Sequence, residues 1–214
     1  MGKKKFYAVK KGYKPGVYEE WSEAQKQVGG FKGAIFKSFA NKDEAYSFLE
    51  ESKNEIQNDK NKIVIYTDGG CINNPGPGGY GAVLIYGENE KDIKGGFSHT
   101  TNNRMELMAA IEALRALKKK DIPIELYSDS RYVVNGISKG WAKKWRENGW
   151  VKSDKKQALN IDLWRSLLDL VEPLSIKFIW VKGHAGNINN ERCDTMATEM
   201  ARSTDMPEDK GFKY

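Results

Sequence analysis

The amino-acid sequence predicts an α/β fold with a mixed β-sheet, preceded by a small α+β domain. Two β-prone runs, residues 63–68 and 124–129, each end in an aspartate, and a helical pattern of apolar residues lies between them. Adjacent strands followed by alternating strands and helices are typical of a mixed sheet. A polar stretch at 51–61, with one apolar residue among eleven, interrupts the chain. We expect it to be a linker between domains at 1–50 and 62–202.

The N-terminal part contains patterns for three short strands and two helices. The strands are expected at Phe6–Lys10, Val17–Glu20 and Ala34–Phe39, where β-branched and aromatic residues gather. Helices are expected to begin near Ser22 and Asp43, because serine and aspartate favour helix N-termini. Three strands with two helices would form the small α+β domain.

The C-terminal part contains four apolar runs that predict strands. They are Lys62–Thr67, Gly81–Tyr86, Ile124–Ser128 and Leu174–Val181. Apolar residues from Met105 to Leu117 recur at helical spacing, and residues 161–171 and 191–202 can also form helices. Residues 203–214 are polar, and we expect a loose C-terminal tail to which no function is assigned.

The composition favours an acidic partner such as nucleic acid. The 214 residues carry a formal charge of +6, with a pI near 9.1. Only two cysteines occur, Cys71 and Cys193, and their separation predicts neither a disulfide framework nor a cysteine zinc site. No apolar stretch at the N-terminus is long enough for a signal peptide or a membrane span. We expect a cytoplasmic protein that does not enter a membrane.

Two aspartates mark the candidate site. If the strands that end at Asp68 and Asp129 are parallel neighbours, their carboxylates meet at the sheet edge where α/β proteins bind ligands. Carboxylates that lie together repel each other and raise each other's pKa, so such a cluster normally holds a cation. An all-oxygen ligand set favours Mg²⁺ or Mn²⁺ over zinc. The alternative is that both aspartates only cap the turns or helices that follow.

Four acidic motifs and one histidine loop follow each other along the chain. Asp68 heads a glycine-rich turn that extends to Ala82, and Glu106 lies at the start of the long helical pattern. The motifs are Asp68-Gly69-Gly70-Cys71, Thr101-Asn102-Asn103-Arg104-Met105-Glu106-Leu107, Asp129-Ser130-Arg131-Tyr132-Val133 and Asn190-Glu191-Arg192-Cys193-Asp194, with the loop Val181-Lys182-Gly183-His184-Ala185-Gly186 before the last. In this order they closely resemble type 1 ribonuclease H over residues 62–202.

The resemblance implies a fold and an activity. The fold would be the ribonuclease H-like mixed five-stranded sheet flanked by helices. Asp68, Glu106, Asp129 and Asp194 would hold two Mg²⁺ ions, with Mn²⁺ as an alternative, at the scissile phosphate. The enzyme would cut the RNA strand of an RNA/DNA hybrid and leave 5′-phosphate and 3′-hydroxyl ends. We expect the hybrid as partner and a monomeric protein.

The loop histidine is assigned by the same resemblance. His184 would assist proton transfer or product release, whereas a loop histidine outside any motif is more often a solvated surface group. His99 has no supporting motif and is expected to lie on the surface.

Recognition of RNA requires contact with the 2′-hydroxyl in the shallow minor groove. Asn74, Thr101, Asn102 and Asn103 match family positions that contact the hybrid. From local sequence alone, Asn74 could be a turn residue before Pro75, and Asn102 or Asn103 a helix cap.

Arg131 departs from the family pattern. Glutamine is common at this position, two residues after the third carboxylate, so the glutamine's hydrogen bonds cannot be carried over unchanged. An arginine could still contact base edges or phosphate.

A basic segment at 139–156 resembles the basic protrusion of the family. It carries seven basic and two acidic side chains around three tryptophans. Lys143 and Lys144 are expected to contact phosphate. Trp141 and Trp145 are four residues apart and would share a helix face, so they either contact substrate or brace the protrusion by packing.

The N-terminal part resembles the hybrid-binding domain found ahead of some ribonucleases H. Tyr7, Trp21, Phe36 and Lys37 match positions where rings stack on DNA sugars and a lysine binds phosphate, whereas Ser38 replaces a second lysine often seen there. The alternative is an accessory domain in which Trp21 and Phe36 belong to the core.

Two other functions are compatible with parts of the pattern. A non-catalytic hybrid-binding protein would keep the basic surfaces but lose a carboxylate, whereas all four are present. A DNA transferase could share the fold and the metal site, but the asparagines and the basic protrusion favour the hybrid nuclease.

Overall fold

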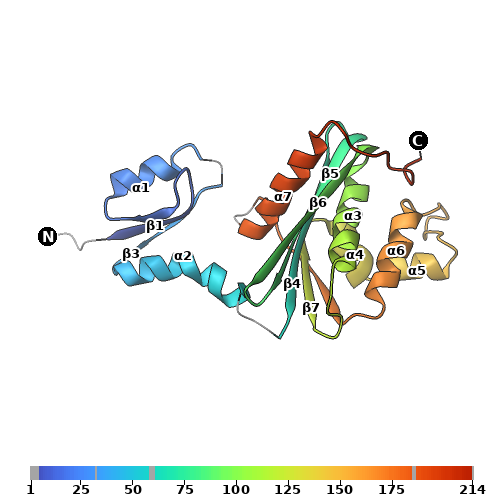
Figure 1. The fold of residues 1–214 in the computed structure, drawn as a ribbon, viewed down its shortest axis with the longest axis horizontal. Coiled ribbons are helices and arrows are strands. Elements are labelled where there is room, and N and C mark those ends of the chain that lie inside the picture. The colour runs from blue at the N-terminus through green and yellow to red at the C-terminus, as the bar shows by residue number, and fades with distance from the viewer. Residues whose placement is uncertain (1–4, 32, 58–60, 185–186, 214) are drawn as a thin grey trace. The chain divides into compact units, whose positions relative to one another are not determined.

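The structure, a computed structural model, describes residues 5–31, 33–57, 61–184 and 187–213. The chain divides into two compact units, the N-terminal unit with residues 1–59 and 184–187 and the C-terminal unit with residues 60–183 and 188–214. Figure 1 shows the elements of both units. No helix among the described residues is long and apolar enough to cross a membrane.

The N-terminal unit is a three-stranded antiparallel sheet with two helices packed on it. The strands lie in the order β2-β1-β3, with β1 at the centre. The elements are β1 Phe6–Lys11, β2 Gly16–Tyr18, α1 Trp21–Val28, β3 Ile35–Phe39 and α2 Lys42–Gln57. The core is small, and its fully buried side chains are Ala8, Val9, Ala24 and Ala45. This arrangement confirms the predicted α+β domain.

The predicted boundaries in this unit differ most from the structure at the end of the second strand and at the end of α2. The second strand ends at Tyr18 rather than Glu20. Helix α2 continues to Gln57, into the stretch that we expected to be a linker. That stretch contains no glycine or proline, so nothing in it stops a helix that has already begun. The weak apolar content of the stretch therefore did not exclude a helix.

The C-terminal unit contains a five-stranded mixed sheet in the order β6-β5-β4-β7-β8. Strands β4, β5 and β6 pair antiparallel, whereas β4, β7 and β8 are parallel. The strands are β4 Ile63–Cys71, β5 Gly76–Tyr86, β6 Asn89–Thr100, β7 Ile124–Ser128 and β8 Ile176–Trp180. The mixed five-stranded sheet was predicted and is confirmed.

Helices lie on both faces of this sheet, and further helices pack against them. Helix α7 lies on one face, against β4, β5 and β6, while α3 and α4 lie on the other (Figure 1). Helix α6 packs against α3, and α5 packs against α4 and α6. The helices are α3 Asn102–Arg115, α4 Arg131–Ser138, α5 Trp141–Glu147, α6 Ile161–Val171 and α7 Ile188–Ala201.

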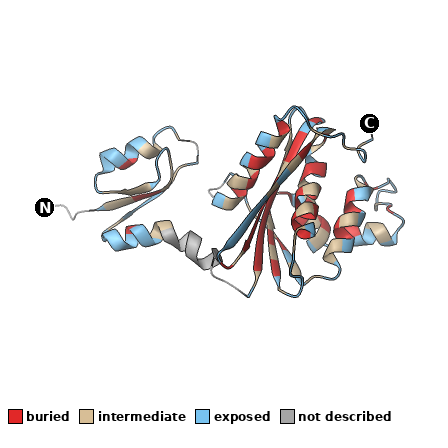
Figure 2. Ribbon diagram, viewed as in Figure 1, coloured by how far each residue is buried: buried red, intermediate tan, exposed pale blue. Residues whose placement is uncertain are grey.

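The core lies between the sheet and the α3 layer. Strand β4 is buried from Ile63 to Gly69, as expected for a central strand covered on both faces. Helix α3 buries Leu107, Ile111 and Leu114, three and four residues apart, and these pack with Trp164 of α6. The buried residues line the sheet and the inner sides of its helices (Figure 2).

Small residues let α7 approach the sheet closely. A Cβ atom on Gly81 would overlap the carbonyl oxygen of Cys193, and one on Gly79 would overlap that of Ala197. Gly79 and Gly81, which we expected in a long turn after Asp68, instead lie on β5 and form part of the surface against which α7 packs. Because Gly81 is the register partner of Asp68, this contact also sets the height of α7 beside the first carboxylate.

The apolar patterns did not predict β6. Its first half, residues 89–94, carries four charged side chains and lies at the exposed edge of the sheet. An edge strand is solvated on one side and needs few apolar residues, so the period-two signal is weak.

The C-terminal tail is also ordered, contrary to the expectation of a loose segment. Asp209 accepts hydrogen bonds from the Arg104 guanidinium and from Thr100, and the Ser98 amide donates to the Pro207 carbonyl. The side chains of Arg104 and Asp209 are only 3% and 5% exposed. A buried arginine needs a carboxylate partner, and this one is supplied from far along the chain.

Candidate active site

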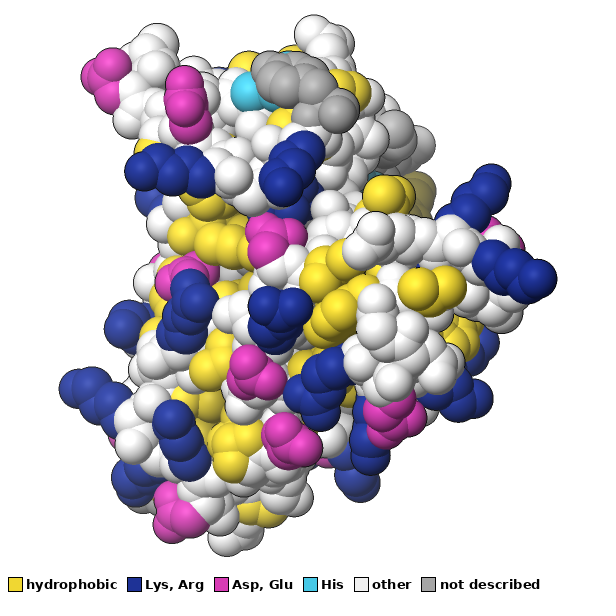
Figure 3. Space-filling view, turned by 90° about the vertical axis from the view of Figure 1, so that its right-hand side faces the viewer, with side chains coloured by type: hydrophobic (Ala, Val, Ile, Leu, Met, Phe, Trp, Pro, Cys, Tyr) yellow, Lys and Arg dark blue, Asp and Glu magenta, His cyan; other side chains and the backbone are white. Residues whose placement is uncertain are grey.

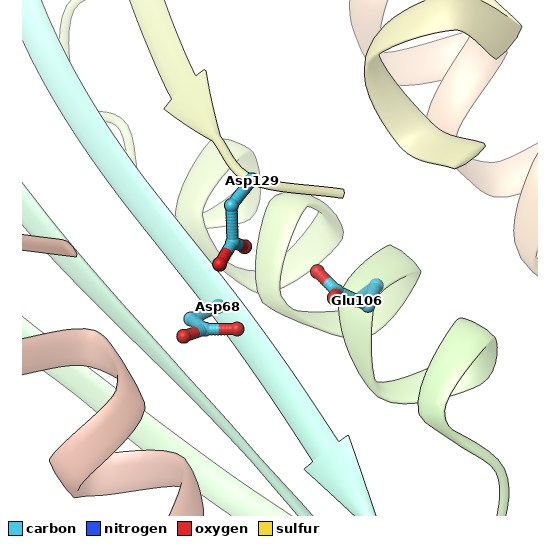
Figure 4. A group of neighbouring side chains, drawn as sticks. All are labelled: Asp68, Glu106 and Asp129. Carbon is cyan, nitrogen blue, oxygen red and sulfur yellow. The ribbon is translucent and has the colours of Figure 1, made fainter. Parts of the chain in front are cut away.

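The two aspartates meet because their strands are parallel neighbours in register. Residues Tyr66 and Thr67 of β4 pair with Tyr127 and Ser128 of β7, so the next residue on each strand is an aspartate. The Tyr66 and Tyr127 rings stack with their centroids 5.0 Å apart. Asp68 and Asp129 therefore emerge side by side where β7 ends, and their carboxylates point toward each other (Figure 4).

Glu106 joins them from the second turn of α3. A Cβ atom on Gly69 would overlap the backbone at Met105 and Glu106, so the glycine after Asp68 lets α3 lie directly against β4. Carboxylate oxygens of Asp68, Glu106 and Asp129 all lie within 4.8 Å of one another. Strand β4, helix α3 and the residue that follows β7 thus each supply one acidic side chain to the same site (Figure 4).

The capping alternative does not describe these aspartates. Ser130 caps α4, because its hydroxyl accepts from the Val133 amide at 3.4 Å, and Asp129 lies before that cap. Asp68 accepts from the neighbouring Gly69 amide at 2.7 Å, but β4 continues past it to Cys71. Trp180 at the end of β8 donates from Nε1 to the Asp129 carbonyl oxygen at 3.0 Å and holds the backbone there.

Crowding makes these carboxyl groups hard to ionise. Burial, with the nearby charges of Asp129 and Asp194, raises the pKa of Asp68 to about 8, despite the opposing Gly69 hydrogen bond. Burial, with the charges of Asp68 and Asp129, raises the pKa of Glu106 well above its ordinary value. The buried Oε2 atom of Glu106 accepts no hydrogen bond from the described residues. Carboxylate oxygens that repel one another, with one Glu106 oxygen buried without a donor, fit a hard divalent cation.

Asp194 borders the same site from α7. It lines a groove together with Asp68 and Glu106, and its charge contributes to the raised pKa of Asp68. It is not among the three residues whose oxygens lie within 4.8 Å of one another. Asp194 is half-buried, and its helix is set against the opposite face of the sheet from α3.

Comparison with known proteins gives the same result as the geometry. A family profile described as RNase H matches residues 60–202, and one described as the ribonuclease H1 N-terminal domain matches residues 5–49. The chain belongs to the ribonuclease H family. It is therefore an enzyme, with a second domain ahead of its ribonuclease H domain.

Its similarity to individual ribonucleases H covers the larger domain. It is 53% identical over 151 residues to ribonuclease H of Syntrophus aciditrophicus, covering 71% of this chain and 87% of the relative. It is 55% identical over 148 residues to ribonuclease H of Desulforamulus reducens, covering 69% of this chain and 92% of that one.

Solved structures show the same fold. LC9-RNase H1, a type 1 RNase H with the type 2 active-site motif, matches with a TM-score of 0.59 at 30% identity, covering 66% of this chain and 72% of that one. A foamy viral protease-reverse transcriptase in complex with RNA/DNA hybrid matches with a TM-score of 0.60 at 22% identity, covering 68% and 20%. The second similarity concerns the fold alone.

The histidine loop of this ribonuclease H domain passes beside the carboxylates. A Cβ atom on Gly183 would overlap Asp129 Oδ2, so the loop backbone lies against that carboxylate. His184 follows with a positive φ of 51° and an exposed side chain. Ala185 and Gly186 of the motif lie outside the described residues.

The three asparagines lie in two segments, the β4–β5 turn and the start of α3, that are joined by a hydrogen bond. Asn74 Oδ1 accepts a hydrogen bond from the Asn102 amide at 3.1 Å and so joins the β4–β5 turn to the start of α3. Thr101 is the N-cap residue, so neither Asn102 nor Asn103 caps the helix. The side chains of Asn102 and Asn103 are exposed. The cap alternative is wrong for both, while Asn74 does contact the helix N-terminus.

Arg131 has a specific partner. Its guanidinium lies 4.5 Å from the centroid of the Trp180 ring, the same ring that bonds to the Asp129 backbone. The arginine is exposed and held by stacking rather than by a carboxylate. Trp180 was not singled out from the sequence, although its place at the end of a predicted strand was a usable signal.

The two tryptophans of the basic segment have different environments. Trp145 is partly buried and lies edge-on to the fully buried Trp164 at 5.9 Å, so it braces the protrusion. Trp141 is 38% exposed, with Lys139 Nζ 5.6 Å from its ring centroid. Lys143 and Lys144 are exposed on α5. The face of the molecule near α5 and α6 carries many Lys and Arg side chains among apolar ones (Figure 3).

The N-terminal residues form an exposed aromatic surface. Trp21 lies 5.3 Å from Tyr7 and 5.4 Å from Phe36, measured between ring centroids. Together with Lys37 and Ser38 they line one shallow pocket. Trp21 is 38% and Phe36 44% exposed, so neither belongs to the core, and the core alternative is wrong.

Proposed function

We propose that this chain is an endonuclease that hydrolyses the RNA strand of RNA/DNA hybrids, with two divalent cations held by Asp68, Glu106, Asp129 and Asp194. The observation that carries the proposal is the group of three carboxylates within 4.8 Å, bordered by the fourth along one groove. Mg²⁺ is the expected ion and Mn²⁺ the alternative, since both prefer carboxylate oxygens. Products with 5′-phosphate and 3′-hydroxyl ends are expected.

The residues divide the chemistry between them. When bound, the two cations would lower the pKa of a water molecule and compensate negative charge on the departing oxygen. The carboxylates would hold the cations in position, and the Trp180 hydrogen bond keeps the backbone of Asp129 in place. His184, which is exposed and follows Gly183 in the chain, would assist proton transfer or product release.

Recognition of the hybrid would be shared by separate surfaces. Asn74, Thr101, Asn102 and Asn103 cluster at the start of α3, where their polar groups can contact a 2′-hydroxyl in a minor groove. Arg131, Trp141, Lys143 and Lys144 are exposed and suited to phosphate or sugar contact. Trp145 would act indirectly by supporting this segment.

The N-terminal domain would add a second hybrid-binding site. Tyr7, Trp21 and Phe36 present ring faces beside Lys37, a combination that binds a nucleic acid strand by stacking and charge. We also propose a monomer in the cytoplasm, where two widely separated and unpaired cysteines suit a reducing compartment.

A substrate panel tests the proposal. RNA/DNA hybrid, double-stranded RNA and duplex DNA are offered with Mg²⁺, and we expect cleavage of the hybrid with the RNA strand cut. Asp129→Asn should reduce cleavage at least roughly a thousandfold while hybrid binding stays within about twofold, because the substitution removes a metal ligand and keeps the volume. Preference for duplex DNA would contradict the proposal.

A further inference from the structure

The groove that contains the carboxylates continues beyond them. Its floor is the end of β4 from Gly69 to Cys71 together with Ile72, and one wall begins at Asn102. The other wall is α7, with Thr198 and Arg202 at its far end. A Cβ atom on Gly70 would meet nothing within 4 Å, so the floor faces open space.

Helix and strand run in the same direction along this groove. Gly81, the partner of Asp68, lies against Cys193, while Gly79, the partner of Gly70, lies against Ala197 and Ala201. At 1.5 Å per residue, Arg202 lies roughly 12 Å along the helix from Asp194. Four strand residues span roughly 13 Å from Asp68 to Ile72. Both walls therefore extend a similar distance past the metal site.

Arg202 differs from every other arginine of the chain. In the part of the chain that the structure describes, its guanidinium has neither a carboxylate nor an aromatic partner, and its side chain is exposed. The other six are engaged. Arg104, Arg115, Arg146 and Arg192 form ion pairs, and Arg131 and Arg165 stack on tryptophans.

The geometry points to Arg202 as a phosphate-binding residue that extends the substrate groove and contacts a backbone phosphate near, but not at, the cleaved bond. A planar guanidinium binds phosphate through two parallel hydrogen bonds, and this one is not neutralised by the protein. It lies at the end of a groove whose other end holds the catalytic carboxylates. The inference rests on the proposed function, because it takes a nucleic acid strand as the occupant.

An alternative role for Arg202 is to stabilise the end of α7. It follows the last residue of α7, and a cation there interacts favourably with the helix dipole. That role requires only positive charge near the helix end and predicts a lower melting temperature on neutralisation, with no change in the salt dependence of hybrid binding. A neutral variant therefore distinguishes the two roles: loss of phosphate binding changes the salt dependence, whereas loss of a helix-dipole contact changes only the melting temperature.

The test measures hybrid affinity over a range of salt concentrations in EDTA, where no cleavage occurs. Arg202→Gln should weaken binding roughly five- to tenfold at low salt and make the slope of log K against log salt shallower by about one. Arg202→Glu should weaken binding further, and Arg202→Lys should keep most of the slope. Arg115→Gln is the matched control, since Arg115 is exposed on α3 outside the groove.

The slope of log K against log salt decides between the two roles. A shallower slope for Arg202→Gln and an unchanged slope for Arg115→Gln support phosphate binding by Arg202. An unchanged slope overturns it, even if the melting temperature falls. If Arg202→Gln is too unstable to measure, Arg202→Lys and Arg202→Glu are compared instead. The same measurements in a Trp21→Ala background prevent the N-terminal domain from masking the effect. If the unsubstituted protein fails to cut hybrid with Mg²⁺, the proposed function fails instead.

Discussion

The carboxyl groups of Asp68 and Glu106 oppose folding when they are ionised without a cation. Their pKa values are raised in the folded protein, that of Asp68 from 3.8 to about 8, first by burial and then by neighbouring charge. Between about pH 3.8 and pH 8 the folded state therefore binds more protons than the unfolded chain. The stability that these groups contribute is therefore present at low pH and is lost as the pH rises through about 8.

Metal-free protein should accordingly become less stable between pH 5 and pH 8. Each unit of raised pKa corresponds to about 1.4 kcal/mol, so the change should be measurable by urea unfolding in EDTA. Added Mg²⁺ should raise the melting temperature more at pH 8 than at pH 5, because at low pH the cation competes with protons.

Asp129→Asn serves as the control for this effect. It removes a charge that raises the pKa of Asp68, so the metal-free variant should lose less stability over the same pH range. A metal-free stability that is constant or rises from pH 5 to pH 8 would contradict the assignment of a repulsive carboxylate cluster.

Among single residues, those that follow from local pattern were predictable from the sequence. Asp68 and Asp129 end similar apolar runs, and parallel pairing then places them together. The partners of Arg131 and Trp145 were not predictable, because Trp180 and Trp164 approach them only through tertiary packing. Periodicity indicates which face is buried, but not which ring lies opposite.

At the scale of elements, the C-terminal segment fastens the start of α3. Asp209 accepts from Arg104 Nε at 2.6 Å and from the Thr100 hydroxyl at 2.6 Å. Asp162 of α6 binds the same guanidinium at 2.7 and 2.9 Å. Three segments distant in sequence thus converge at Arg104 in the first turn of α3, just before Glu106.

Asp209→Ala should destabilise the fold by roughly 2–3 kcal/mol, because it removes charge-assisted hydrogen bonds from an arginine that stays buried. The loss should be smaller than for a fully unpaired charge, since Asp162 remains. Glu208→Ala, at the exposed neighbouring position, should change the unfolding free energy by less than about 0.5 kcal/mol. Equal effects of the two substitutions in urea unfolding would exclude the buried pair as a source of stability.

Elements with a buried apolar face were predicted well, and those without one were not. Strands β4 and β7 and helix α3 followed from their apolar spacing. Edge strand β6, the last turns of α2 and the tail have little apolar signal of their own. Their structure depends on pairing with a neighbouring strand, on helix propagation and on one long-range ion pair, none of which leaves a local pattern.

For the whole molecule, the proposed hybrid-binding surfaces on two separate units would give linked binding. Once one unit holds the hybrid, the other meets it at a high effective concentration, without any new contact between them. The exposed rings of the N-terminal unit and the carboxylate groove of the C-terminal unit would then bind the same hybrid. This arrangement favours several cuts for each encounter.

Removing the N-terminal rings should weaken that linkage while leaving the catalytic unit intact. In the full chain, Trp21→Ala with Phe36→Ala should lower hybrid affinity roughly tenfold or more, because both rings are exposed and contribute stacking rather than core packing. The number of cuts per encounter should fall, measured with a trap of unlabelled hybrid, while the single-turnover cleavage rate at saturation stays the same. Tyr13→Ala removes another exposed ring, outside the Trp21 pocket, and should change neither quantity. If the double variant binds and cuts as the unsubstituted protein does, this aromatic surface has no part in binding the hybrid.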